Sequence, residues 1–148
     1  MEYENVTFES PSVHSYLQIL QSVINRMASN STGCKTWCIT LVSAIAILVA
    51  DKSQLQYVWV AIVPISLFFF LDSYYLGLEK RFRVSYNRFI QKLHAGTATV
   101  DDVFIVAPGK IRNQLKDIFF SMLSLSVWPF YVLLLLMLWV VYEVLLVT

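Results

Sequence analysis

Charged residues are scarce in this chain of 148 residues. Asp, Glu, Lys and Arg make up 14% of the sequence, whereas soluble domains contain about 25%. Hydrophobic residues make up 57%, and the mean hydropathy is +0.62. The net charge of +1 points to no class of partner. A chain this short has no room for a membrane domain and a separate enzyme domain, so the composition predicts a small integral membrane protein.

Motifs of common enzyme and metal sites are also missing. The sequence has no glycine-rich phosphate loop, no HExxH and no GxSxG. His14 and His94 are far apart, and Cys34 and Cys38 have no histidine nearby, so no zinc site is predicted. Cysteines four apart on a helix rarely reach disulfide geometry. We therefore expect no enzymatic activity, no cofactor and no metal.

Two apolar segments, 37–50 and 55–71, are separated only by the polar residues 51–54. A membrane crossing needs about 20 mostly apolar residues, and a helix satisfies its own backbone hydrogen bonds in lipid. Residues 32–35 and Asp51 bring the first segment to that length. We therefore predict a transmembrane helical hairpin over 36–78. The alternative, a buried hairpin in a soluble core, is disfavoured by a further apolar run near the C-terminus.

That further run extends from Ile118 to Val147 and contains one acid, Glu143. It exceeds one straight crossing, and Pro129 offers a kink. We predict an amphipathic lead over 111–126 along the inner membrane surface, followed by a third crossing over 127–147. The alternative is a re-entrant hairpin that turns at Trp128 and Pro129.

Positive charge sets the expected topology. Residues 79–117 hold eight of the eleven Lys and Arg residues, which places this segment and the N-terminus in the cytoplasm. The predicted fold is an all-α integral membrane protein in which cytosolic helices continue into the crossings. It has four parts: an N-terminal cytosolic amphipathic helix (1–35), the transmembrane hairpin (36–78), a basic cytosolic segment (79–117) and a C-terminal transmembrane helix (118–148).

Local patterns refine this architecture. Residues 12–28 carry one apolar stripe, which predicts a helix that packs on the basic segment or on another copy. The alternative, a helix on the membrane surface, is disfavoured because its polar face is not rich in lysine and arginine. Gly33 is the only weak point before the first crossing, so the two are expected to form one rod. Pro64 predicts a kink in the second crossing. Residues 79–94 are expected to extend that crossing, with Gly96 ending the helix and Thr99 capping the next turn.

Hydroxyl side chains recur at helical spacing along one side of the first crossing. They are Thr32, Thr36, Thr40 and Ser43. Two interpretations remain open: small-residue packing between helices, or a polar stripe facing water in an oligomeric pore. The third crossing is also a candidate to line a pore. Its candidate residues are Trp128, Trp139 and Glu143, where the tryptophans act as a hydrophobic gate or as interface anchors.

An acid lies in the aromatic band that ends the second crossing. Asp72 is flanked by Phe68–Phe70 and by Tyr74 and Tyr75. A carboxylate at that depth is costly unless it meets water or a partner. Three fates are open: extension to the cytosolic surface, a ring of carboxylates at a pore mouth, or pairing with an arginine of the next segment.

The basic helix after residue 79 is the candidate site for a ligand or partner. Its candidate residues are Arg81, Arg83, Tyr86, Arg88 and Lys92. Positive charge beside a crossing can reflect topology alone. It can also bind anionic lipid, or a nucleotide whose phosphates meet arginines while aromatic rings stack on its bases.

Four short blocks of the sequence resemble small bacterial membrane effectors of anti-phage systems. The blocks are Val23–Ser31, Lys35–Trp37, Leu71–Leu76 and Glu79–Arg83. They look like SLATT-type proteins and the effector of the Hailong system, in which an N-terminal helix leads into a two-helix hairpin and an aromatic-basic helix follows. The similarity covers about residues 16–93, and the chain after residue 95 departs from two-crossing members.

The resemblance implies a homo-oligomeric channel, with four subunits, in the bacterial inner membrane. It would stay shut until a partner nucleotidyltransferase makes a nucleotide second messenger or oligonucleotide. Opening would then collapse the membrane potential and stop phage propagation through growth arrest or death. The alternative function is a non-conducting membrane scaffold that recruits a cytosolic partner.

Overall fold

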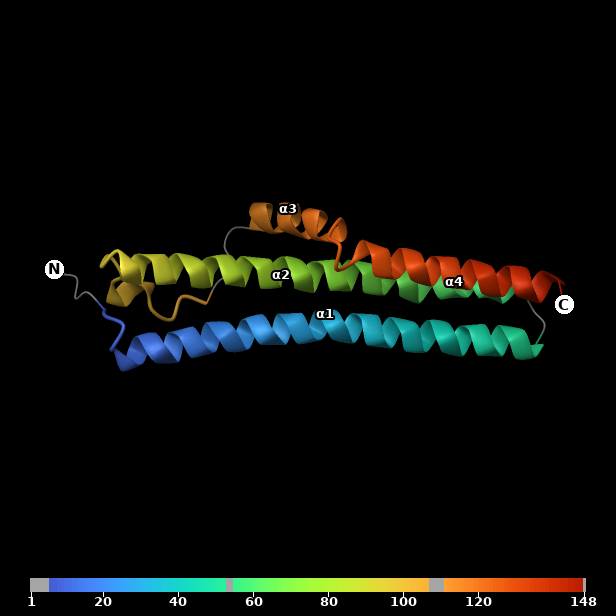
Figure 1. Ribbon diagram of the computed structural model, residues 1–148, viewed down its shortest axis with the longest axis horizontal. Coiled ribbons are helices and arrows are strands. Elements are labelled where there is room, and N and C mark those ends of the chain that lie inside the picture. The colour runs from blue at the N-terminus through green and yellow to red at the C-terminus, as the bar shows by residue number, and fades with distance from the viewer. Residues whose placement is uncertain (1–5, 53–54, 107–110, 148) are drawn as a thin grey trace.

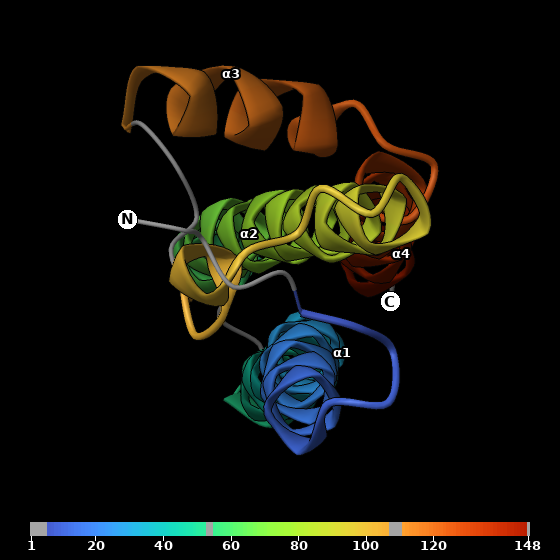
Figure 2. The same cartoon turned by 90° about the vertical axis from the view of Figure 1, so that its left-hand side faces the viewer.

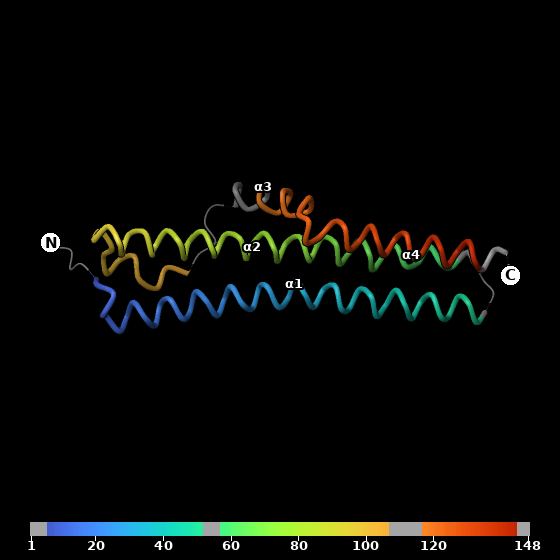
Figure 3. Tube along the Cα trace, in the orientation of Figure 1, coloured from blue at the N-terminus to red at the C-terminus, as the bar shows by residue number. Residues whose placement is uncertain are grey.

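A computed structural model describes residues 6–52, 55–106 and 111–147 of the chain (Figure 1), and Figure 3 shows the Cα trace in the same orientation. The regular secondary structure in these ranges consists of α-helices and 3-10 helices, with no strand. In order they are α1 (Pro11–Lys52), the 3-10 helix η1 (Leu55–Ala61), α2 (Ile62–His94), the 3-10 turn η2 (Val100–Asp102), α3 (Ile111–Met122) and α4 (Trp128–Val147). The prediction of an all-α fold is confirmed.

The molecule is built on a long antiparallel hairpin of α1 and α2 (Figure 1). The buried positions of α1 recur every three or four residues, first at Val13, Tyr16 and Leu20 and later at Cys34 and Cys38. This spacing keeps one seam of α1 against its neighbours along its whole length. The predicted single rod is confirmed. A helical glycine costs only about 1 kcal/mol, so Gly33 does not interrupt a helix packed on both sides of it.

Two separate apolar clusters fill the molecule. The tip cluster joins the first half of α1 to the second half of α2 and to residues 98–103; its core includes Leu20, Ile24, Phe82, Phe89 and Val103. The three-helix cluster joins the second half of α1, η1, the start of α2, and α4; its core includes Cys38, Val42, Ile65, Tyr131 and Leu134. In Figure 1 the tip lies at the N-terminal end and α4 at the other.

The second apolar segment divides into η1 and α2. Pro64 is the third residue of α2, where the backbone N–H would have no intrahelical partner in any case. Pro64 thus lies where the 3-10 helix η1 changes to the α-helix α2, within one helical stretch from Tyr57 to His94, and the kink stays a prediction. From Ile62 to His94 the helix is uninterrupted, as predicted for 79–94. Gly96 adopts φ +66° just after its end, and Thr99 precedes η2 as its N-cap residue, both as expected.

The last two helices pack on the hairpin in different directions. Figure 2 shows α3 from the side while α1 is seen end-on, so α3 runs obliquely across the long axis. It contacts α2 at Gly77, where an added Cβ would lie 3.0 Å from Ile118 Cγ1. By contrast, α4 lies along α1 and the first half of α2 (Figure 1). The boundary expected between an amphipathic lead and a C-terminal helix falls at 123–127.

Two helices are long and apolar enough to cross a membrane, Pro11–Asp51 and Tyr57–His94, while the described apolar part of α4, Trp128–Val144, is shorter. Exposed large apolar side chains gather on the three-helix half of the molecule. They include Trp37, Leu41, Ile47 and Leu48 in α1; Trp59, Val63, Leu67 and Phe70 in η1 and α2; and Leu133, Leu136, Met137 and Val140 in α4. On the described tip helices, 11–30 and 78–94, only Ile19 and Val84 are exposed in this way.

Candidate functional site: a buried ion pair between two clusters

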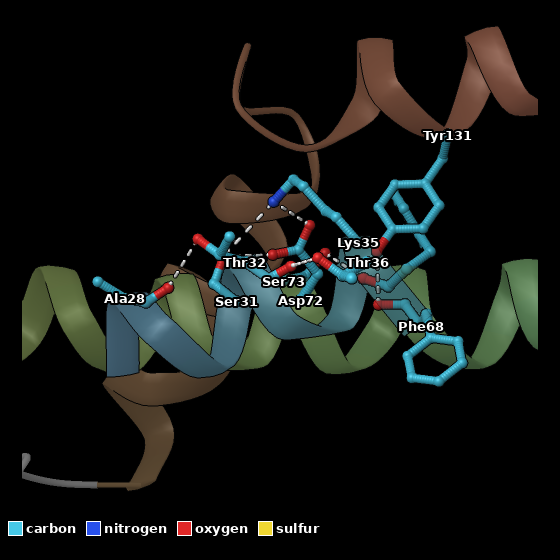
Figure 4. A network of polar contacts seen from close by, with 10 residues as sticks. Ala28, Ser31, Thr32, Lys35, Thr36, Phe68, Asp72, Ser73 and Tyr131 are labelled. Carbon is cyan, nitrogen blue, oxygen red and sulfur yellow. Dashed lines mark hydrogen bonds and ion pairs between the residues drawn. The ribbon is translucent and has the colours of Figure 1, made fainter. Parts of the chain in front are cut away.

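Asp72 is the one charged side chain that is buried in the described part of the chain. Its side chain has 0% exposure, and the ammonium of Lys35, which is 21% exposed, lies 2.6 Å from Oδ2. The Ser31 hydroxyl donates a short hydrogen bond to Oδ1, and Lys35 Nζ also lies 3.5 Å from Ser31 Oγ. Figure 4 shows these side chains of α1 and α2 pointing toward one another. Both carboxylate oxygens are therefore occupied.

The helical sequence explains this meeting. Ser31 and Lys35 are one turn apart on α1 and so share a face. Next to Asp72, the Ser73 hydroxyl donates to the carbonyl of Phe69 at 2.7 Å. From α4, the Tyr131 hydroxyl donates to the Phe68 carbonyl at 3.0 Å. Three helices thus bring hydroxyl groups to one level of the bundle.

The position of this site separates the two apolar clusters. Residues on the α1 seam before Ser31 belong to the tip cluster, and those from Cys38 onward belong to the three-helix cluster. A buried carboxylate is strongly unfavourable without a partner, and removing one member of such a pair exposes that cost. The ion pair therefore joins α1 to α2 at the one level where neither apolar cluster does so.

Of the three possibilities for Asp72, the structure has an ion pair, but the partner is Lys35 of α1 and not an arginine of the next segment. Arg81 of the next segment contacts Asp117 of α3 instead, at 3.5 Å. The sequence did contain a signal. In an antiparallel hairpin, residues equally distant from the turn face each other, and Lys35 and Asp72 lie at nearly equal distances from 51–54.

The four hydroxyl residues of α1 all lie on its exposed face, opposite the buried residues Cys34, Cys38 and Val42. Three of them donate to the carbonyl four residues earlier on the same helix. These bonds are Thr32 to Ala28 at 3.2 Å, Thr36 to Thr32 at 3.3 Å and Thr40 to Thr36 at 2.9 Å. Within one chain the stripe therefore does not pack between helices.

The candidates on α4 lie on a different kind of surface. Trp128, Trp139 and Glu143 are exposed, and their neighbours on the outside of α4 are apolar, as at Leu133, Leu136 and Val140. The Trp139 and Glu143 positions are thus isolated in an apolar face. The described residues of α4 form no row of hydroxyl side chains at helical spacing like that of Thr32, Thr36, Thr40 and Ser43 on α1.

The five candidates for ligand binding are not gathered into one site. Arg83 pairs with Glu79 at 2.8 Å and Arg81 faces α3. Tyr86 packs against the tip cluster, and Arg88 is exposed to solvent. Lys92 reaches the η2 turn, where Nζ lies 2.5 Å from Asp102 Oδ1. Three of the four cations are therefore already engaged by carboxylates of this chain.

Removal of the Lys92–Asp102 pair is expected to change the acid sensitivity of the tip. The hydrogen bond from Lys92, together with the Thr99 backbone N–H at 3.2 Å, holds the pKa of the Asp102 carboxyl below its usual range. A lowered folded-state pKa gives stability that is complete above the unfolded value of about 3.9 and is lost as the pH falls below it. Because the pair is partly exposed, we expect no more than about 1 kcal/mol.

The measurement is the midpoint of thermal unfolding in detergent micelles across pH 6 to 3. The wild-type midpoint should fall more steeply with acid than that of Asp102→Asn. The control is Asp101→Asn, which removes an exposed neighbouring carboxylate and should keep the wild-type profile. Equal slopes for wild type and Asp102→Asn would contradict the assignment.

No protein-family model matches this chain, and neither the curated proteins nor the solved structures include one that is similar to it. The resemblance to anti-phage membrane effectors therefore stays a prediction from the sequence blocks alone.

Proposed function

We propose that the three-helix half of the molecule spans the bacterial inner membrane and that the tip lies in the cytoplasm. Support comes from the exposed apolar side chains, which cover the three-helix half and largely stop at Lys35 and Asp72. Aromatic residues mark both ends of that half: Trp37 and Tyr74 near the ion pair, and the Trp59–Tyr142 ring pair, 5.6 Å apart, at the far end. The basic residues after Glu79 then lie on the cytoplasmic side.

Three crossings follow from this placement. The 20 residues of α4 extend about 30 Å at 1.5 Å per residue, which matches the hydrocarbon core of a bilayer. The second crossing comprises η1 and the first half of α2, and the more extended rise of a 3-10 helix lengthens it. The N-terminus lies in the cytoplasm, and the chain ends on the outer side.

The function we propose is a homo-oligomeric ion channel lined by α1. The observation that carries it is the exposed stripe Thr32, Thr36, Thr40 and Ser43, which enters the apolar half of α1. The outer faces of α2 and α4 there are largely apolar and carry only isolated polar residues, Ser66 and Glu143. Lipid suits the apolar faces, and water or another copy suits the hydroxyl stripe. Copies arranged around an axis, four in the arrangement that the resemblance implies, would turn α1 inward.

The sequence resemblance supports a place for this channel in anti-phage defence. A nucleotide signal or partner protein would act on the cytosolic tip, opening would depolarise the membrane, and growth would stop. Because α1 and α2 each run unbroken from the tip into the membrane half, a displacement at the tip would reach the pore through the level of the Lys35–Asp72 pair.

The test is conductance of the purified protein in planar bilayers, with and without candidate nucleotides. Discrete currents are expected, and Thr36→Leu combined with Thr40→Leu should lower them about tenfold or more, because an apolar lining favours dewetting of a narrow pore. The matched control is Val132→Leu combined with Val140→Leu on the exposed face of α4, which should conduct like wild type. The absence of current from the wild-type protein would contradict the proposal of a channel. Wild-type currents in the threonine variant as well as in the control would show that α1 does not line the pore.

A second function, a non-conducting scaffold, is favoured by one observation. The tip carries exposed apolar side chains outside its helices, at Phe8, Val100, Phe104, Ile105 and Val106. These lie on the same end of the molecule as exposed Arg88 and suit a soluble protein partner. Replacing Arg81, Arg83 and Arg88 should then abolish recovery of the partner, while Thr36→Leu with Thr40→Leu should leave function intact. A partner that still bound the triple arginine variant would exclude that surface.

A further inference from the structure

The last turn of α3, from Phe119 onward, and the turn after it expose strongly apolar side chains. Phe119 and Phe120 are 62% and 67% exposed, and Leu123 and Leu125 are 65% and 83% exposed. No other described part of the chain covers these side chains. Four large apolar residues gathered on one short segment form a patch that water alone does not suit.

The opposite side of α3 is fixed to the hairpin. Asp117 pairs with Arg81 at 3.5 Å, and Ser121 is fully buried. Ile118 lies so close to Gly77 that a Cβ there would be 3.2 Å from the Ile118 Cα. The contact at Gly77 therefore holds α3 with its backbone close to α2 and its phenylalanines turned outward.

The level of this contact along the molecule is informative. Gly77 and Arg81 follow Asp72 by about one and a half and two and a half turns of α2 toward the tip, where exposed apolar residues give way to polar ones. The helix also runs obliquely across the bundle (Figure 2), which allows it to lie along a bilayer surface while the bundle crosses it. Along the chain, exposed Trp128 lies between Leu125, the last residue of this patch, and the further exposed apolar side chains of α4.

We infer that α3 is an in-plane membrane anchor whose Phe119, Phe120, Leu123 and Leu125 insert into the cytoplasmic leaflet among the upper acyl chains. This inference rests on the membrane placement proposed above and does not depend on conduction. The occupant is lipid because the patch lies at the polar–apolar boundary of the bundle and directly precedes α4, whose exposed face is largely apolar. An amphipathic segment of this kind binds the interface by burying its apolar side chains.

The test is spin-label accessibility in phosphatidylethanolamine–phosphatidylglycerol nanodiscs. Single cysteines at 120 and 123 are labelled in a background with Cys34→Ala and Cys38→Ala, and each label is exposed to oxygen and to a water-soluble nickel chelate. Two references are matched for exposure: Val84, 57% exposed on a tip helix, and Leu136, 53% exposed on α4. Because both natural cysteines are buried, labels in a background that keeps them provide a second measurement if the alanine background folds poorly.

The expected result is that labels at 120 and 123 resemble Leu136, with oxygen accessible and nickel excluded, while Val84 shows the reverse. Labels at 120 and 123 that resemble Val84, with Leu136 still lipid-like, would overturn the anchor and leave the membrane placement standing. Spin–spin broadening between copies at these positions would show that a second copy covers the patch, which also overturns it. Nickel access at Leu136 itself would remove the membrane placement and the anchor together.

Discussion

Asp72→Ala is expected to lower the free energy of unfolding by about 3 kcal/mol, the low end of the range for breaking a buried ion pair. The substitution removes the acceptor of the Ser31 hydroxyl and the counter-charge of Lys35. Lys35 keeps 21% exposure, so its ammonium reaches some water, and for this reason we do not expect the upper end of the range. The measurement is reversible thermal or denaturant unfolding in detergent micelles.

A double-mutant cycle separates the pair from its surroundings. Lys35→Met combined with Asp72→Leu removes both charges, keeps apolar volume, and should recover most of the loss, because an apolar pair can replace a buried ion pair at little cost. The matched control is Asp117→Ala, which removes a carboxylate that is 45% exposed in the Arg81 pair and should cost less than about 1 kcal/mol. Additive effects of the two single changes at 35 and 72 would contradict an energetic coupling between them.

Gly77→Leu is expected to displace α3 from α2 and to cost about 1–3 kcal/mol, the range for overpacking a closely packed site. An added Cβ would meet the side chain of Ile118 at 3.0 Å and its backbone Cα and N at 3.2 and 3.3 Å. Two of these atoms belong to the backbone, so relief requires movement of α3 as a whole. The readout is amide hydrogen exchange at 117–122, which should quicken selectively.

Gly33 supplies the matched control. Both glycines lie inside helices, but a Cβ at Gly33 would meet nothing within 4 Å. Gly33→Ala should therefore stabilise the protein by up to about 1 kcal/mol through helix propensity, whereas Gly77→Ala should gain less or nothing because Ile118 must give way. Equal stabilisation by both alanines would show that α3 does not depend on the close approach at Gly77.

The extents of the two long helices could be predicted from the sequence, because they depend on the local spacing of apolar residues. The apolar seam of α1 continues through Gly33, and residues 79–94 continue the stripe of α2, so both long helices were predicted. Gly96 and Thr99 also have the local roles expected of them. The irregularity that Pro64 predicts corresponds to the change from η1 to α2, because a proline is tolerated in the first turn of an α-helix.

Contacts between distant segments were harder to predict. For a paired Asp72 the sequence predicts a partner among the arginines of the following segment, whereas the proximity of Lys35 depends on the register of the hairpin. The candidate cations of the basic helix meet acids of this chain, because Glu79, Asp102 and Asp117 engage three of them. The contact between α3 and Gly77 could not be predicted from the sequence. It joins Gly77 to Ile118, which are far apart in the chain, so no helical periodicity relates them.

The threonine hydroxyls of α1 have a consequence for biogenesis. Thr32, Thr36 and Thr40 each donate to a carbonyl of their own helix, so these donors are satisfied before one copy meets another. A newly inserted monomer therefore meets lipid with these three donors already paired, while its hydroxyl oxygens still favour water or another copy. Under the proposed function, assembly would then be set by the density of monomers in the membrane, and a cell could hold the protein harmlessly dispersed at low expression.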